Sequence, residues 1–164
     1  MTPVMRGVIV AIAQVALMSA VGARLLYDRV TLPRAWVETA GVDPDLPIRG
    51  RYVALNLLFP AAAESAAVRV PEGNTAVGRV VVRDGAAVAV LRGRADAEEP
   101  RDGDVYFVER TTPGGLRWML TDPVAFFLPE QAPDPTREVR PGELWLEASF
   151  PARSAPRPIR LERR

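Results

Sequence analysis

The sequence contains no cysteine, no histidine and no lysine. Without cysteine there are no disulfides, thiol nucleophiles or cysteine-ligated zinc or iron–sulfur centres. Without histidine there is no Ser-His-Asp triad and no histidine-ligated metal. Without lysine there is no Schiff base and no complete P-loop. The carboxylate, hydroxyl and arginine side chains that remain form no recognisable catalytic motif. The sequence therefore predicts no catalytic, cofactor-binding or metal-binding residue, and no cofactor.

A charge excess of one sign is also lacking. The 21 basic residues, all arginine, balance 20 acidic residues, so the formal net charge is +1 over 164 residues. A nucleic-acid-binding protein usually carries a basic patch, and we therefore expect no nucleic acid partner. The chain is 48% hydrophobic and has a length typical of one globular domain.

One long apolar run is present near the N-terminus. Gly7–Ala23 contains no charged residue, and Leu25 and Leu26 extend the run beyond Arg24. As a helix, the uncharged run spans about 26 Å, close to the thickness of a bilayer core. The sequence predicts a transmembrane anchor in residues 1–29, with its helix over about 7–26.

Two alternatives to an anchor remain open. The run resembles a cleaved signal peptide, because the small residues Ala20, Gly22 and Ala23 follow its apolar core. A buried core helix of a soluble protein is the other alternative. Arginines near the ends of the run do not favour placing the following domain outside the cytoplasm, because more of them follow the run than precede it.

Residues 30–164 are predicted to form an all-β domain, a mainly antiparallel small sandwich or barrel. Asp84–Gly85 and Pro113–Gly115 are turn sequences between apolar runs, and each predicts a hairpin. Val124–Leu128 is expected to form a short strand or a helical turn. Residues 152–164 are expected to form a solvated tail or to contact anionic lipid. Within them, residues 159–161 are a candidate edge strand. The expected strands are Leu32–Val42, Arg51–Phe59, Thr75–Val82, Ala86–Leu91, Asp104–Thr111, Leu116–Leu120 and Glu143–Phe150. Such short, regularly spaced strands are typical of small sandwiches and barrels.

Val42–Leu57 reads VDPDLPIRGRYVALNL and carries a family resemblance. The segment resembles the signature of the GDYxxLxY family, a functionally uncharacterised group of bacterial membrane-anchored proteins. Gly50, Tyr52 and Leu55 match the family's Gly, Tyr and Leu, whereas Arg51 replaces its Asp and Leu57 its final Tyr. The segment FFLPE, from residue 126, resembles a second stretch of the family. The resemblance implies an N-terminal anchor with a β domain outside the cytoplasm, and no activity or cofactor.

Charged residues crowd the predicted loop before the second strand. Asp43 and Asp45 precede Arg49 and Arg51. A pair of arginines can hold a carboxylate or phosphate, so these residues, with Gly50, Tyr52 and Leu55, are the candidate recognition site. A turn whose aspartates cap backbone groups explains the same pattern. Tyr52 itself is expected in the core or at its rim, with its hydroxyl group hydrogen-bonded.

A second charged segment contains Glu98, Glu99, Asp102 and Asp104. Carboxylates in this number can bind a hard cation such as calcium, but Pro100 and Gly103 favour a solvated loop instead.

These observations predict a membrane-anchored, extracytoplasmic β domain that acts as an interaction or accessory module for an envelope or integral membrane partner. Two other functions stay open. One is an envelope hydrolase that uses two carboxylates, which requires a pocket holding two acids with raised pKa values. The other is a secreted small-ligand carrier with a cleaved signal peptide, whose binding site is the barrel mouth.

Overall fold

The computed structural model describes residues 3–40, 52–71, 73–129, 131, 135, 139–140, 142–152 and 154–164. The chain separates into two compact units, Met1–Leu32 and Pro33–Arg164. The first unit contains the helix α1 (Pro3–Thr31), and the described residues of the second unit form nine strands and one short 3₁₀ helix.

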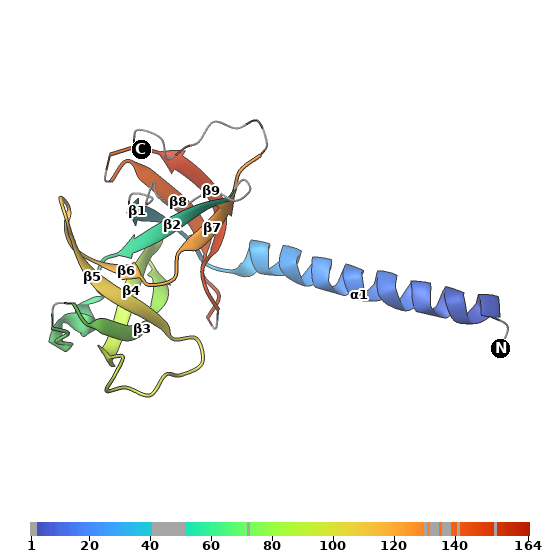
Figure 1. The fold of residues 1–164 in the computed structure, drawn as a ribbon, viewed down its shortest axis with the longest axis horizontal. Helices are drawn as coiled ribbons and strands as arrows, with labels where there is room; N and C mark the ends of the chain where they lie inside the picture. The colour runs from blue at the N-terminus through green and yellow to red at the C-terminus, as the bar shows by residue number, and fades with distance from the viewer. Residues whose placement is uncertain are drawn as a thin grey trace. The chain divides into compact units, whose positions relative to one another are not determined.

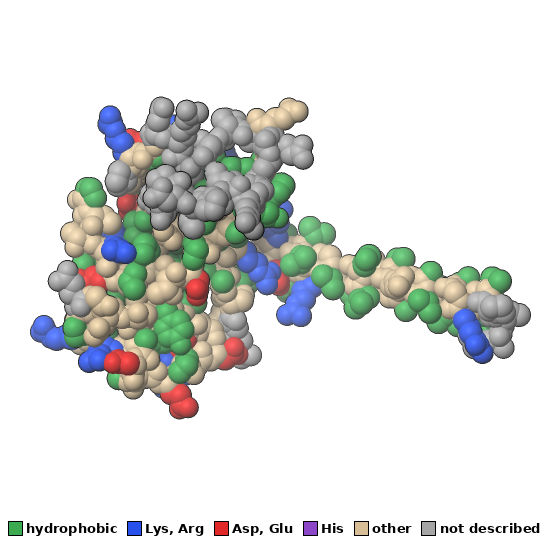
Figure 2. Space-filling model, viewed as in Figure 1, with side chains coloured by type: hydrophobic (Ala, Val, Ile, Leu, Met, Phe, Trp, Pro, Cys, Tyr) green, Lys and Arg blue, Asp and Glu red, His purple; other side chains and the backbone are tan. Residues whose placement is uncertain are grey.

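Helix α1 has 29 residues, so it is about 44 Å long. It extends beyond the predicted 7–26 at both ends, and Leu32 N still donates to Asp28 O at 3.0 Å. Pro33 follows directly, and proline disfavours a helical conformation in the residue before it. Apolar side chains occur all round the helix, and Figure 2 shows them along its visible face with arginines toward its two ends. The helix is long and apolar enough to cross a membrane, and none of its most apolar window is buried within the chain.

The second unit is built on a six-stranded β-barrel. Its strands are β1 (Arg34–Ala40), β2 (Tyr52–Phe59), β3 (Thr75–Arg83), β4 (Ala86–Arg94), β5 (Val105–Thr112) and β6 (Gly115–Leu120). The strand order β2-β6-β5-β3-β4-β1 is closed by pairing of β1 with β2. Every neighbouring pair is antiparallel except β1 and β4, which are parallel. The predicted mainly antiparallel all-β fold is confirmed, and it is a barrel.

Three further strands extend this barrel (Figure 1). β7 (Val124–Phe127) pairs with β2, β8 (Leu144–Ser149) pairs with β1, and β9 (Arg157–Arg163) pairs with β8. The segment after Ala152 is therefore largely an edge strand, and the expectation of a solvated tail is wrong there. The short helix η1 (Ala63–Ala67) lies between β2 and β3 in the sequence.

Both predicted hairpins are present. Asp84 and Gly85 have φ angles of 51° and 78°, which is the left-handed conformation that a type I′ turn requires at both central positions. Gly115, with φ of 99°, begins β6 after the second turn. Because these turns fix where each hairpin folds back, they also fix the register of β3 with β4 and of β5 with β6.

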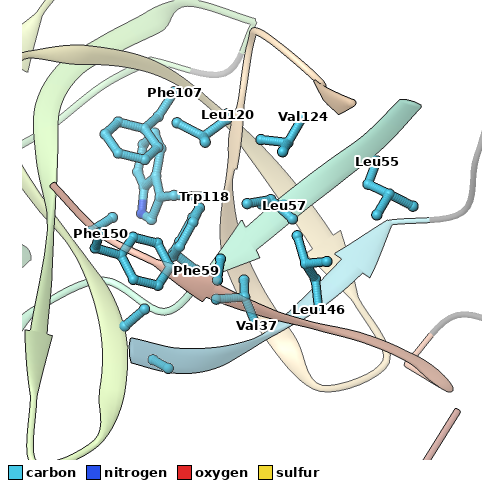
Figure 3. Packing of buried hydrophobic residues seen from close by; sticks show 14 of the residues in the cluster. Val37, Leu55, Leu57, Phe59, Phe107, Trp118, Leu120, Val124, Leu146 and Phe150 are labelled. Atoms are coloured by element: carbon cyan, nitrogen blue, oxygen red, sulfur yellow. The ribbon is translucent and has the colours of Figure 1, made fainter. Parts of the chain in front are cut away.

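Aromatic and aliphatic side chains fill the interior. Phe59 lies edge-on to Phe107 and to Phe150, with 6.2 Å between ring centroids in each pair. Figure 3 shows these rings gathered with Trp118 in the space that the strands enclose. The largest fully buried side chains belong to Phe59, Phe107, Leu55, Leu57, Leu146 and Val77. The packed core thus fills the interior of the barrel, and the outer surface and the ends of the barrel remain accessible.

Candidate functional site

Most of the predicted recognition site cannot be placed. Asp43, Asp45, Arg49, Gly50 and Arg51 lie outside the residues that the structure describes. Tyr52, the first residue of β2, and Leu55, within the same strand, are described.

Leu55 and Tyr52 face opposite sides of β2. Leu55 is fully buried in the core, whereas Tyr52 is 54% exposed. Successive strand residues point to alternate faces, so two residues three positions apart cannot share a face. The sequence predicts Tyr52 in the core or at its rim, and its exposure contradicts only the core position. Its ring instead packs edge-on against Phe127 of β7, with 5.3 Å between centroids, at the register position directly opposite.

The acidic segment after β4 folds back onto an arginine of that strand. Arg92 forms ion pairs with Asp104 and with Glu98, and its Nη2 donates to Glu99 O at 3.1 Å. Asp104 also accepts a hydrogen bond from Arg101 N at 2.8 Å. Over the described part of the chain, no group of three or more acidic side chains is arranged to hold a metal ion. The carboxylates of Glu98 and Asp104 therefore hold this segment against Arg92.

The hydroxyl group of Ser65 is held by two hydrogen bonds. Ser65 is buried in η1, and its Oγ accepts a hydrogen bond from Leu91 N at 2.8 Å. The same hydroxyl lies 3.3 Å from Ala89 O, to which it donates. With both bonds formed, the hydroxyl joins η1 to β4 and is not free to attack a substrate.

Two surface pockets are lined by described residues. One, with a volume of about 270 Å³, lies between β7 and the segment before β9, and is lined by Val124, Ala125 and Pro156 together with Tyr106 and Asp122. The other, of about 240 Å³, lies on the outer face of the barrel and is lined by Leu58, Met119, Glu38 and Arg110. Each pocket is lined by a single carboxylate residue.

The carboxyl pKa shifts found in the described chain are downward. The guanidinium of Arg83, hydrogen-bonded to Glu64, lowers the pKa of Glu64 to about 2. Arg94 lowers the pKa of Asp96 in the same way. A general acid for glycan hydrolysis requires a raised pKa and a second carboxylate nearby. Neither Glu64 nor Asp96 therefore has the raised pKa that such a general acid requires.

Beside the outer pocket, two arginines face each other across a hairpin. Arg110 of β5 lies directly opposite Arg117 of β6. Arg117 Nε is 3.8 Å from Glu38 Oε2, and its Nη1 donates to Leu116 O at 3.1 Å. Arg110 is exposed and has no ion pair or hydrogen bond within the described residues. Like charges directly opposite each other in a sheet are destabilising, so this pair is an unusual feature of the surface.

Sequence reasoning missed this arginine pair, although a signal was present. Thr112 pairs with Gly115 around the predicted turn, and counting outward from that pairing places Arg110 opposite Arg117.

Comparison with models of known protein families, with curated proteins and with solved structures finds no match for this chain.

Proposed function

We propose that this chain is a single-pass membrane protein in which α1 anchors the β-barrel unit, and that the barrel unit is an interaction module for an envelope or integral membrane partner. The barrel unit lies outside the cytoplasm in this proposal. The orientation rests on the resemblance of Val42–Leu57 to the GDYxxLxY family.

The exposure of α1 is the observation that carries the proposal. No residue of its most apolar window is buried within the chain. Exposed apolar surface costs roughly 25 cal/mol per Å² in water, and a helix that is apolar all round normally lies in a core or in a membrane. The exposure of this apolar window favours a bilayer over the core-helix alternative.

The filled interior of the barrel supports an interaction role over a carrier role. A carrier of the barrel-mouth type needs an enclosed cavity, whereas Phe59, Phe107 and Leu57 are fully buried within this core. Binding is therefore assigned to the outer surface of the module.

Two measurements on cells test the anchor and its orientation. A reporter that is active only outside the cytoplasm is fused after Arg164, and the N-terminus of the mature protein is sequenced. We expect an active reporter on a membrane-bound protein that retains residues 6–26. A silent reporter on a membrane-bound fusion contradicts the orientation, and loss of residues 6–26 supports the secreted carrier instead.

The interaction role is tested by crosslinking in intact membranes, followed by solubilisation and mass spectrometry. We expect a stoichiometric membrane or envelope protein attached to the barrel unit. Recovery of the chain without a partner, at its natural abundance, contradicts the role.

A further inference from the structure

We propose that the outer pocket beside Arg110 and Arg117 binds a carboxylate of a partner polypeptide together with the apolar side chain next to it. This inference rests on the proposed function and assigns a binding site to the interaction module.

The electrostatic argument begins with the two arginines. Their side chains leave the same face of the β5–β6 hairpin at directly opposed positions, where Cβ atoms are about 5 Å apart. Of the two, Arg117 has Glu38 as an ion-pair partner, while Arg110 has none in the part of the chain described. The group formed by Glu38, Arg110 and Arg117 therefore carries one uncompensated positive charge, and an anion placed at Arg110 balances it.

Arg117 is held in place before any ligand arrives. Besides its contacts with Glu38 and Leu116, its guanidinium lies over the hairpin turn, where a Cβ atom on Gly114 would be 3.2 Å from Nη2. The absence of a side chain at Gly114 thus leaves room for the guanidinium. Glu38 is also confined, with a side chain only 14% exposed. Because these groups are already ordered, binding at Arg110 does not require them to be reorganised.

The apolar walls of the pocket indicate that an apolar side chain binds beside the carboxylate. Arg110 lines the pocket together with the apolar residues Leu58 and Met119. The two apolar residues are register neighbours on β2 and β6, so they form one continuous surface. A volume of about 240 Å³ suits one apolar side chain better than a folded element. A peptide carboxylate followed or preceded by a Leu-sized side chain presents both features, because arginine binds carboxylates through two parallel hydrogen bonds.

The test uses the full chain in an uncharged detergent and fluorescent pentapeptides as probes. One peptide, Gly-Ser-Gly-Glu-Leu, has free carboxylates, and its match, Gly-Ser-Gly-Gln-Leu-amide, has none. We expect the charged peptide to bind about tenfold more tightly, which is the usual value of a charge-assisted contact. Replacing leucine by glycine in the charged peptide weakens binding as well, because the apolar surface is then left uncovered.

Variants assign the binding to this pocket. Arg110→Gln is expected to abolish the tenfold preference for the charged peptide. Arg110→Lys is expected to keep only part of it, because lysine lacks the planar guanidinium that forms two parallel hydrogen bonds to a carboxylate. Met119→Trp fills the pocket and weakens binding while both arginines remain. Arg69→Gln removes the same charge from an exposed residue outside the pocket and is expected to bind like the unaltered chain. Circular dichroism checks that each variant is folded.

Three outcomes overturn the proposal. The first is equal binding of the two peptides, and the second is equal peptide binding by Arg110→Gln and Arg69→Gln. The third is displacement of the fluorescent peptide by inorganic phosphate and by vesicles of anionic phospholipid as effectively as by the same peptide without its fluorophore. The last result assigns the pocket to generic anions or to lipid headgroups.

If the peptide fails to bind while a membrane partner is still crosslinked, the proposed binding site is wrong and the interaction role stands. If the peptide binds and no partner is crosslinked, the pocket stands and the interaction role fails.

Discussion

The guanidinium carbon of Arg164 lies 3.9 Å from the centroid of the Trp36 ring and 5.8 Å from that of Trp145. Arg164 N also donates to Glu143 O at 2.8 Å, which continues the pairing of β9 with β8. The residue after β9 is thus attached to the outer face of β1 and β8 by a cation–π contact and a backbone hydrogen bond.

Arg164→Gln removes this cation and is expected to lower the free energy of unfolding by about 1 kcal/mol, the scale of a partly exposed cation–π contact. Chemical denaturation of the full chain in detergent measures the loss, and tryptophan emission reports the change around Trp36. Arg69→Gln is the control. Unchanged emission and unchanged stability in Arg164→Gln show that the contact is not formed.

Ser65→Ala leaves Leu91 N without its hydrogen-bond acceptor in a buried position. We expect a loss of about 1–3 kcal/mol of stability, the cost of an unsatisfied buried polar group. Ser154→Ala, at an exposed serine, is expected to change stability little. Equal denaturation midpoints for the two variants contradict the structural role of the Ser65 hydroxyl.

Gly78→Ala places a Cβ atom 2.3 Å from Val90 O and 2.9 Å from Leu91 Cα. Backbone cannot move aside at low cost, and the register of β3 with β4 already shifts between Val77 and Gly78. We expect destabilisation of at least about 3 kcal/mol, at the upper end for an overpacked core, measured as loss of folded barrel. Gly22→Ala in α1 meets no atom within 4 Å and serves as the matched substitution. A folded Gly78→Ala barrel of normal stability shows that the strands pack differently.

The pair Glu64 and Arg83 predicts a pH dependence of stability. Arg83 Nη1 donates to Glu64 Oε2 at 2.8 Å and lowers the pKa of Glu64 from 4.5 to about 2. Because the folded-state pKa is depressed, the stabilisation is fully present above pH 4.5 and is lost as the pH falls toward 2.

The measurement is thermal unfolding of the unaltered chain and of Glu64→Gln between pH 2 and pH 7. The unaltered chain is expected to be the more stable of the two near neutral pH, with the difference shrinking steadily as the pH falls from 4.5 toward 2. A difference that stays constant over this range contradicts the pKa shift. Because both side chains are exposed, the effect is small and weakens with salt.

Local signals in the sequence predicted the hairpins correctly. Asp84–Gly85 and the turn at Pro113 determine which residues pair, and the arginine pair at Arg110 and Arg117 follows from the second turn. These features depend on residues close together in the chain, which is why periodicity and turn chemistry suffice for them.

Contacts between distant residues were not predictable in this way. β1 pairs with β2, β4 and β8, and its sequence carries no indication of three neighbours or of a parallel one. The alternation in β2 predicts two faces, but only the neighbouring strand β7 shows that Tyr52 lies on the outer one. The outer pocket likewise combines Glu38, Leu58 and Arg110 from three strands, so no short motif encodes it.

The position of β1 also constrains how the chain acquires its fold. β1 directly follows α1 and is made early, yet the hydrogen bond from Thr39 Oγ1 to Leu144 O joins residues 105 positions apart. During synthesis β1 can pair early with β2, but its backbone groups that pair with β8 stay unpaired until β8 has been made. Proteins dominated by such distant pairings fold slowly and expose unpaired strands meanwhile. The nascent β domain is thus expected to fold more slowly, and to expose an unpaired strand edge for longer, than a helical domain of equal length.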